Sequence, residues 1–389
     1  MAKKVVVIGG GFGGFYAIKT LKQAGEPSSF EVTLIDKNDR FVYLPSLPYL
    51  LSGRKTVEDI TEPFERISRR LGITFVRGEV EGVSLKNKQV LIKGGGAVEF
   101  DYLILSAGAQ TEYYGIPGAE NTVPSWRLED YIELKKQVER NPEGQVCIAG
   151  GGLTGVEVAG ELAEKLGKGK VVLVEKMPHL LPTLNSPKAS EVVENFLRTS
   201  GVRVIKGDGV KGVNDNRLIL ESGSSLDCAV IVWAVGVRAS NISFDVPVEV
   251  KGRGWLVVNS KLQLKGFEDV YAVGDINHFD YNSDSVMKMA EEAILQGKTA
   301  AKNILRQLDG KDPAYEHKPI FLASRPKTLC SVGFNKAIMV WENKILFGRT
   351  PYISKMFIES IVMRDVKGKI GGGVATTLES KILRAISRT

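Results

Sequence analysis

The sequence predicts an α/β protein with two Rossmann-like dinucleotide-binding units, because one glycine motif and its surroundings occur twice. Each copy is an apolar run followed by G-x-G-x-x-G. The glycines are Gly9, Gly11 and Gly14 in the first copy and Gly150, Gly152 and Gly155 in the second. Each copy leads to a second apolar strand that ends in an acid, Asp36 in VTLID and Glu175 in VVLVE. Together the two copies predict two dinucleotides and electron transfer between them.

The spacing suits the binding of a pyrophosphate. A helix N-terminus offers unpaired N–H groups and a positive dipole end, and the first two glycines keep the turn bare so that phosphates can approach. The third glycine lets the helix pack close to its strand. The acid at the strand end accepts ribose hydroxyls and repels a 2′-phosphate. Glu175 therefore favours NADH over NADPH, whereas Lys176, the next residue, weakens this preference.

Composition indicates a globular chain. The 389 residues, 43% hydrophobic and 25% charged, predict two or three domains. No apolar run reaches the roughly 18 residues of a transmembrane helix, and Met-Ala-Lys-Lys leads straight into a strand, which leaves no room for a signal peptide. Cys147, Cys228 and Cys330 are far apart and form no C-x-x-C, which predicts a reducing cytoplasm and no sequence-adjacent redox dithiol. Cys147, in mid-strand, is expected to be a buried apolar residue. The three histidines are isolated, so we expect no metal site.

The remaining elements follow from hydrophobic periodicity. Helices are expected at 13–24, 59–71, 128–140, 154–166, 187–200 and 285–308. Apolar strands are expected at 101–109 and 227–239, and strands with amphipathic pieces at 320–389. Each unit is thus predicted to contain, in order, a strand, a glycine turn, a helix, a strand that ends in an acid, a β meander and an apolar strand. This order indicates an internal duplication.

The positive charge is concentrated near the C-terminus. Residues 344–389 hold 9 Lys/Arg and 3 Asp/Glu, whereas the other 343 residues hold 43 and 42, so nearly all of the net charge of +7 lies there. Apolar residues form two helical stripes: Tyr352, Ile353, Met356, Phe357 and Ile361, and then Leu378, Ile382 and Ile386 beside Lys381, Arg384 and Arg388. This pattern predicts an interfacial tail on an anionic membrane. Packing of the tail on the core or on a second subunit is the alternative. No nucleic-acid motif accompanies the charge.

These motifs resemble the two-dinucleotide-binding-domain flavoprotein superfamily over about residues 3–305, and within it the type II NADH:quinone oxidoreductases. The broad resemblance rests on both glycine loops, the strand ends SAG (106–108) and WAVG (233–236), and VGD (273–275). The narrower one rests on YLPSLPYLLSGRKTVEDI (43–60), GVEVAGELAE (155–164), VWAVGVRAS (232–240) and AEEAILQGKTAAKNI (290–304). It implies an FAD-binding domain in two parts (1–112 and 251–319), an NADH-binding domain (113–250) and a membrane-facing α+β segment (320–389).

The resemblance also implies roles for single residues. FAD would be held by Gly9, Gly11, Gly13, Gly14, Asp36, Lys37, Ala107, Gly108, Asp275, Met289 and Ala290. NADH would be held by Gly150, Gly152, Gly155, Glu175 and Gly236. Glu157 would lie near the nicotinamide, Pro45 near the isoalloxazine ring, and Glu291 on the quinone-side helix, whose N-terminus, starting near Met287, would face the flavin. In that helix Glu291 and Leu295 replace glutamines that are usual in the family.

Cysteine usage bears on the final electron acceptor. Thiol-linked relatives need a redox cysteine beside the flavin, and the segment Leu44–Tyr49 has none. We therefore expect hydride transfer from NADH to FAD and electron transfer to a membrane quinone, by an enzyme on the inner face of the cell membrane. A sulfide:quinone or thiol/disulfide-linked oxidoreductase of the same fold remains an alternative, as does a redox-sensing flavoprotein that docks a protein partner. A homodimer is also left open.

Overall fold

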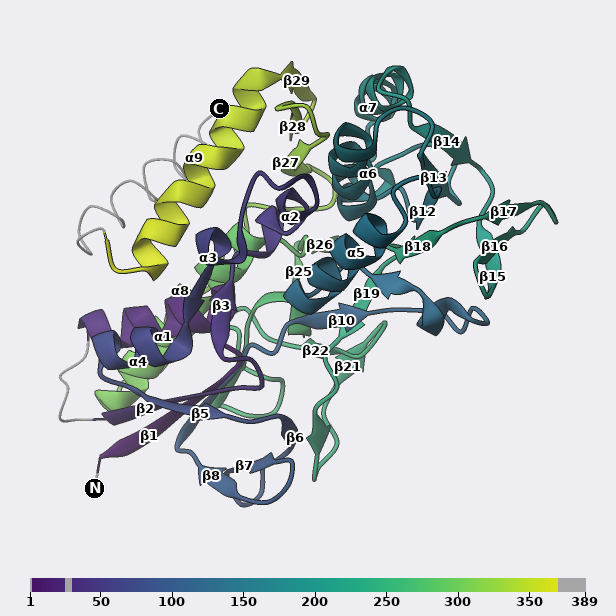
Figure 1. Ribbon diagram of the computed structural model, residues 1–389. Helices are drawn as coiled ribbons and strands as arrows, with labels where there is room; N and C mark the ends of the chain where they lie inside the picture. Colours follow the sequence, from purple (N-terminus) through teal and green to yellow (C-terminus); the bar gives the residue numbers. More distant parts are fainter. Residues whose placement is uncertain (1, 25–29, 370–389) are drawn as a thin grey trace.

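A parallel β-sheet in the order β23-β9-β1-β2-β5 forms the centre of the first unit (Figure 1). The structure, a computed structural model, describes residues 2–24 and 30–369. The strands are β1 (Lys3–Ile8), β2 (Phe30–Asp36), β5 (Thr74–Arg77), β9 (Tyr102–Leu105) and β23 (Val270–Ala272). The last four residues of β1 and the last three of β9 are buried, as expected of a parallel sheet covered on both faces.

The second unit repeats this arrangement. Its parallel sheet has the order β11-β18-β12-β13-β14, so that β12 takes the place of β1, β13 that of β2, and β18 that of β9. The strands are β11 (Val123–Pro124), β12 (Val146–Ala149), β13 (Val171–Glu175), β14 (Arg203–Lys206) and β18 (Val230–Trp233). Figure 1 shows the two sheets in separate halves of the molecule. The predicted fold class, with two Rossmann-like units, is confirmed.

Helices cover both sheets. The helices are α1 (Phe12–Ala24), α5 (Leu128–Arg140), α6 (Leu153–Leu166), α7 (Pro187–Thr199) and α8 (Ala290–Leu308). The first helix, α1, packs closely against α8, because a Cβ at Gly297 would lie 2.2 Å from the carbonyl oxygen of Gly13. The start of α7 is fixed by Pro187 at the first helical position and by the Ser186 hydroxyl, which accepts a hydrogen bond from the Ala189 N–H (3.3 Å).

Each of the two units also contains smaller β-sheets. They comprise β6 (Val80–Ser84), β7 (Gln89–Ile92), β8 (Ala97–Glu99) and β20 (Ser243–Phe244) in the first unit, and β15 (Val210–Asn214), β16 (Arg217–Leu220) and β17 (Ser225–Asp227) in the second. Others are β21 (Val250–Lys251), β22 (Trp255–Val257), β24 (Asn277–His278), β25 (Asp280–Tyr281) and β26 (Asp284–Ser285). The two segments that link the units, β10 (Ala109–Thr111) and β19 (Val237–Ala239), pair antiparallel.

The C-terminal segment joins the two units. Its antiparallel strands β27 (Lys327–Ser331), β28 (Ala337–Trp341) and β29 (Lys344–Gly348) lead into α9 (Arg349–Val366), which is yellow in Figure 1. A Cβ at Gly160 of α6 would lie 2.2 Å from the backbone of Val332, so this glycine lets the segment touch the second unit. Ion pairs tie α9 to the first unit: Asp365 with Lys19 (2.5 Å) and Glu359 with Lys55 (2.6 Å).

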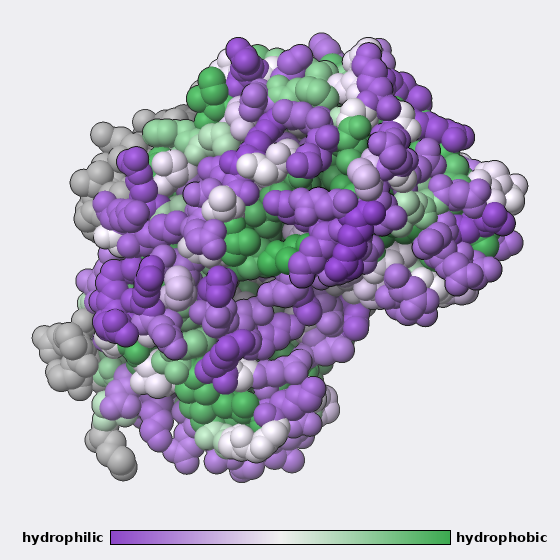
Figure 2. Space-filling view, in the orientation of Figure 1, coloured by the Kyte–Doolittle hydropathy of each residue, from purple (hydrophilic) through white to green (hydrophobic). Residues whose placement is uncertain are grey.

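The predicted apolar stripe of α9 does not form one outward face. Ile353 and Phe357 are 64% and 54% exposed, whereas Ile361 is buried in the protein. The second predicted stripe, Leu378, Ile382 and Ile386, lies outside the described residues. Within the ranges that the structure describes, no helix is long and apolar enough to cross a membrane. Figure 2 shows a mostly hydrophilic face with a hydrophobic area in its middle.

Two predicted helices differ from the structure. The region 59–71 is divided into α3 (Val57–Ile60), β4 (Thr61–Pro63) and α4 (Phe64–Leu71). Proline at the end of β4 cannot continue a helix, and β4 pairs with β3 (Arg40–Val42). A short α2 (Tyr49–Ser52) precedes them. The predicted helix 285–308 begins only at Ala290, because Met287 donates its N–H to the carbonyl of Phe321 (2.9 Å) and is thereby held outside the helix.

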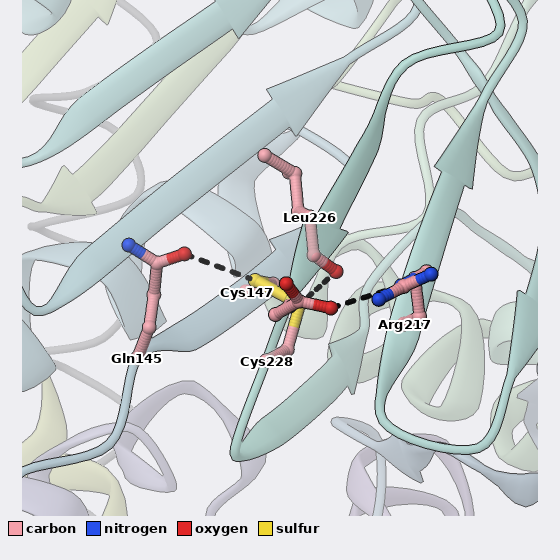
Figure 3. The surroundings of a disulfide bond; sticks show 6 residues. Gln145, Cys147, Arg217, Leu226 and Cys228 are labelled. Atoms are coloured by element: carbon pink, nitrogen blue, oxygen red, sulfur yellow. Dashed lines mark hydrogen bonds and ion pairs between the residues drawn. A yellow bond between two sulfur atoms is a disulfide. The ribbon is translucent and has the colours of Figure 1, made fainter.

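The prediction for Cys147 was right in part: the residue is buried among apolar side chains, as expected, but it is not a free cysteine. Cys147 in β12 forms a disulfide with Cys228, which follows β17 (Figure 3). The two are 81 residues apart in sequence, and their Cα atoms are 5.8 Å apart because β12 pairs with β18, which begins two residues after Cys228. The separation of these two cysteines in the sequence gives no indication that they form a disulfide. The disulfide removes the cysteine argument for a reducing compartment.

Candidate dinucleotide and flavin site

The first glycine loop has the geometry of a phosphate cradle. Gly9 has φ of +93°, and a Cβ there would lie 2.3 Å from the carbonyl oxygen of Ser106. A Cβ at Gly14 would lie 1.9 Å from the carbonyl oxygen of Gly9, so α1 reaches this close to β1 through a glycine. By contrast, a Cβ at Gly11 would meet no atom within 4 Å. The loop therefore packs closely against the rest of the protein at Gly9 and Gly14, whereas the space beside Gly11 is open.

The second loop repeats this geometry almost atom for atom. Gly150 has φ of +100°, and its Cβ would lie 2.4 Å from the carbonyl oxygen of Ala234. A Cβ at Gly155 would lie 1.8 Å from the carbonyl oxygen of Gly150, and one at Gly152 would meet nothing within 4 Å. Both loops thus present the start of a helix to an open position, which suits an anionic pyrophosphate.

The two strand-end acids are also placed alike. Asp36 accepts hydrogen bonds from the N–H groups of Gly10 and Asn38 (2.8 Å each). Glu175 accepts them from Gly151 (2.6 Å) and Met177 (2.8 Å). Burial raises the pKa of Asp36, although these two N–H groups act in the opposite direction. Each carboxylate therefore joins its glycine loop to the end of its own strand.

A cavity of about 660 Å³ opens beside the first loop. Its walls include most of the residues predicted for the flavin and for catalysis: Gly9, Gly11, Gly13, Asp36, Lys37, Pro45, Ala107, Gly108, Glu157, Asp275, Met289, Ala290 and Glu291. Gly14 lies behind the loop against β1. The residues predicted for the second nucleotide, Gly150, Gly152, Gly155, Glu175 and Gly236, are not among its walls. The structure therefore brings together one predicted set around the cavity and leaves the other at the second loop.

An acid and an amine share one wall of the cavity. Asp275 lies in the turn after β23, and burial raises the pKa of its carboxyl while the nearby Lys288 lowers it. Burial lowers the pKa of Lys288 to about 8, although Asp275 opposes this change. The Lys288 ammonium donates to the carbonyl oxygen of Asn277 and lies 4.8 Å from the ring centre of Trp255. Sequence reasoning found Asp275 and missed Lys288.

Glu157 is bound by two segments from the C-terminal part of the chain. Its Oε1 accepts hydrogen bonds from the backbone N–H (3.0 Å) and the hydroxyl (3.2 Å) of Ser331 in β27, and from the Lys355 ammonium of α9. Lys355 is 5% exposed. Burial disfavours its charge, but Glu157, Tyr49 and Cys330 together outweigh burial, so the pKa of Lys355 is raised. A buried ion pair therefore lies where the cavity meets α9.

The first turn of α8 forms another part of the wall. Glu291 lines the cavity, and burial raises the pKa of its carboxyl. Gln296, one turn further and buried, accepts hydrogen bonds from the Gly274 N–H (2.7 Å) and the Asn277 side chain (2.8 Å). Pro45, in the short 3₁₀ turn Leu44–Ser46, also lines the cavity. The helix α8 and the turn next to Asp275 are thus joined by the side-chain amide of Gln296.

A comparison with known families decides the classification. A model of the pyridine nucleotide-disulphide oxidoreductase family matches residues 3–297, well over half of the sequence. The chain belongs to this family.

Curated members of the family agree in name with the resemblance inferred from the motifs. A type II NADH:quinone oxidoreductase from Staphylococcus saprophyticus is 27% identical over 399 residues, with 95% of this chain and 96% of that protein covered. One from Staphylococcus aureus has the same identity and coverage over 400 residues. The predicted family is confirmed.

Similar solved structures establish the fold alone. NDH2 from Plasmodium falciparum in complex with NADH has a TM-score of 0.79 at 18% identity, covering 93% of this chain and 95% of that one. A sulfide:quinone oxidoreductase from Aquifex aeolicus also has 0.79, at 19% identity, covering 94% and 92%. The equal scores mean that the fold does not separate these two activities.

One further cluster in this member of the family was not predicted. The buried Tyr49 hydroxyl, Arg54 Nη1 and Glu161 Oε1 have no hydrogen-bond partner among the described residues. The other Glu161 oxygen accepts from Ser52 (2.5 Å), and Arg54 Nη1 lies 3.6 Å from Oε1. Burial raises the pKa of Glu161 to about 7, although Ser52 and Arg54 lower it. The repeated acids of GVEVAGELAE, spaced as on one helix face, were the available signal.

Proposed function

We propose that this protein carries FAD at its first loop, accepts hydride from NADH at its second loop, and passes the electrons to a quinone. Two observations support the nucleotide assignments: the matched loop geometry, and a large cavity whose walls include Gly9, Gly11 and Gly13 of the first loop but, of the second loop, Leu153 and Thr154 and none of its glycines. The name shared by the staphylococcal relatives over 95% of this chain supports the overall reaction.

The first loop fits FAD on the geometry of its own residues. The open position at Gly11 leaves room for a pyrophosphate at the start of α1, and Asp36 lies where ribose hydroxyls would reach it. Asp275 offers a carboxyl to the polar chain that links pyrophosphate and ring. The flavin, when bound, supplies the redox chemistry of hydride and electron transfer. The protein positions it, excludes water and adjusts the local charge through Lys288 and the N-terminus of α8.

The residues around Glu157 would serve proton balance near the ring. Glu157 and Lys355 are shielded from bulk solvent, are bonded to each other and line the cavity. A carboxylate beside an ammonium is neutral overall, so the pair can stay ionised in the interior; a proton that it gave to a bound group would have to be replaced from solvent to avoid leaving a negative charge.

The observation that favours a quinone over a thiol acceptor is the composition of the cavity walls. No cysteine is among the described lining residues, whereas Tyr43, Leu47, Pro48, Leu329 and Ile358 are. Cys147 and Cys228 are bonded to each other in the second unit. Cys330 is buried, its Sγ lies 3.7 Å from the carbonyl of Leu153, and burial raises its pKa, which disfavours a reactive thiolate.

An anaerobic titration tests the proposal. NADH should bleach the flavin absorbance of the purified protein, and a short-chain quinone should restore it without added thiol. Cys330→Ser should leave both rates within about twofold. Bleaching by sulfide but not by NADH, or a Cys330→Ser variant that no longer transfers electrons, would favour the sulfide- or thiol-linked alternative. Restoration only by a protein fraction would favour the redox-sensing one.

For its location we propose the inner surface of the cell membrane, reached through the outward side of α9 and the basic tail. Ile353 and Phe357 are the exposed apolar residues of α9, and 9 of the residues in 344–389 are Lys or Arg. Exchange of both apolar residues to serine, or deletion of 375–389, should lower co-sedimentation with anionic vesicles several-fold. Leu91→Ser, a 39% exposed apolar residue of β7, is the matched control. Unchanged sedimentation of both test proteins would contradict this placement.

A further inference from the structure

The end of β13 carries a charge arrangement that the glycine motif does not explain. Glu175 is buried, and both of its oxygens are held by backbone N–H groups, those of Gly151 and Met177. One bond from the glycine loop and one from the backbone just after β13 hold both oxygens of this carboxylate in place. A ligand group that reaches the strand end therefore meets a negative charge at a fixed place.

Lys176, the residue after Glu175, forms an ion pair with a residue from another part of the second unit. The Lys176 ammonium donates to Oε1 of Glu221 (2.7 Å), which follows β16. Their side chains are 69% and 46% exposed, so the pair lies at the surface, where the ribose end of a nucleotide would enter. Lys176 therefore points toward Glu221, although its position in sequence would let it serve a 2′-phosphate.

Glu221 is held in position by its own turn. Its N–H donates to the carbonyl of Gly209 (2.8 Å), and a Cβ at Gly209 would lie 2.9 Å from the Glu221 carboxyl carbon. Asp208 accepts hydrogen bonds from the N–H (3.0 Å) and hydroxyl (2.6 Å) of Ser222. The N–H of Asp208 in turn reaches the carbonyl of Glu175 (3.4 Å). This turn and the end of β13 are thus one connected surface.

The neighbouring cations are also engaged by carboxylates. Lys206, at the end of the adjacent strand β14, and Arg198 of α7 both bind Glu194 (2.6 and 2.9 Å). The strand end consequently presents Glu175, Asp208 and Glu221 around Lys176. A 2′-phosphate would add two negative charges to this surface, whereas a ribose hydroxyl adds none.

We propose that Glu221 determines nucleotide specificity: by binding Lys176 it keeps this cation from a 2′-phosphate, so that the second loop prefers NADH to NADPH. The inference rests on the proposed function, because it assumes that the second loop binds the nicotinamide nucleotide. The choice between NADH and NADPH would thus depend on two carboxylates: Glu175, which the glycine loop helps to hold in place, and Glu221, which acts by binding Lys176.

Binding measurements on the flavin-loaded protein test this assignment. Glu221→Gln should tighten the dissociation constants of NADPH and of 2′,5′-ADP at low ionic strength by about twofold to fivefold, the range that an exposed ion pair supports. The constants for NADH and 5′-AMP should stay within about twofold. Adding Lys176→Met to Glu221→Gln should remove the gain, since the freed ammonium carries it.

A matched control lies at the other end of the same strand. Lys170, just before β13, binds Glu143 at the same distance of 2.7 Å. Glu143→Gln removes the same charge and should leave the ratio of NADPH to NADH affinity unchanged. An unchanged ratio in Glu221→Gln, or a gain that persists with Lys176→Met, overturns this inference while the proposed function stands. A wild-type protein that binds neither nucleotide overturns both.

Discussion

Replacing Glu161 by glutamine should make the stability of this protein less dependent on pH. The side chain lies in α6, and its carboxyl is completely buried. One oxygen accepts from Ser52, and the other has no hydrogen-bond partner among the described residues although Arg54 lies 3.6 Å away. Burial raises the pKa of this carboxyl from 4.5 to about 7.

The direction of this pH dependence follows from the number of protons that the folded and unfolded chains bind. Because the pKa is higher in the folded protein than in the unfolded chain, the folded protein holds more protons between about pH 4.5 and 7. The contribution of Glu161 to the free energy of unfolding is therefore largest below pH 4.5 and is lost as the pH rises toward 7. At about 1.4 kcal/mol per pH unit, the loss amounts to about 3 kcal/mol.

Urea unfolding of wild type and Glu161→Gln between pH 5 and 8 measures this effect. The variant should gain about 2–3 kcal/mol relative to wild type across that range, because a neutral amide cannot ionise. Glu133→Gln, which removes an exposed carboxylate of α5, controls for net charge. A difference between Glu161→Gln and wild type that stays constant over the range would show that Arg54 keeps Glu161 ionised throughout, and the reasoning would be refuted.

Three other changes probe the site and its supports. Lys355→Met should lower the free energy of unfolding by about 3 kcal/mol or more, because it leaves Glu157 buried without its cation; thermal unfolding checks this, and a double variant with Glu157→Gln should recover most of the loss. Cys147→Ser should cost about 2–4 kcal/mol, and added reductant should then have no further effect; equal stability with and without reductant in wild type would argue against the disulfide. Gly11→Ala should leave the circular dichroism unchanged but lower the FAD content, whereas Gly14→Ala, whose Cβ would lie 1.9 Å from a carbonyl oxygen, should also reduce the amount of folded protein.

The geometry of the two glycine loops could be predicted from the sequence because everything it requires is local. Gly9, Gly14 and Asp36 act within one strand–turn–helix–strand unit, so their spacing alone carries the geometry. The helix predicted over 59–71 failed for an equally local reason. Pro63 interrupts it at the end of strand β4, and the apolar spacing that continues past the proline belongs to a new helix, α4.

Pairs formed between distant segments were the part that could not be predicted. The Glu157–Lys355 pair joins residues 198 positions apart, and the disulfide joins residues 81 apart. No periodicity or motif connects such residues, since their contact depends on how strands and helices pack. Lys355 in particular lies among apolar residues of α9, where the sequence gives no sign that it points inward.

The two loops differ in what covers them, and this difference supports their separate roles. Around the first loop, α8 packs so closely on α1 that Gly297 permits the contact, and β27 and α9 add walls to the cavity. A nucleotide held there would be enclosed by segments from both ends of the chain and would exchange slowly. At the second loop the strand end is bordered by the exposed side chains of Lys176 and Glu221. A nucleotide bound there can enter and leave at each turnover, as a hydride donor must. In the proposed function the two similar loops therefore take different roles because of segments from the C-terminal third of the sequence, which contains neither glycine motif.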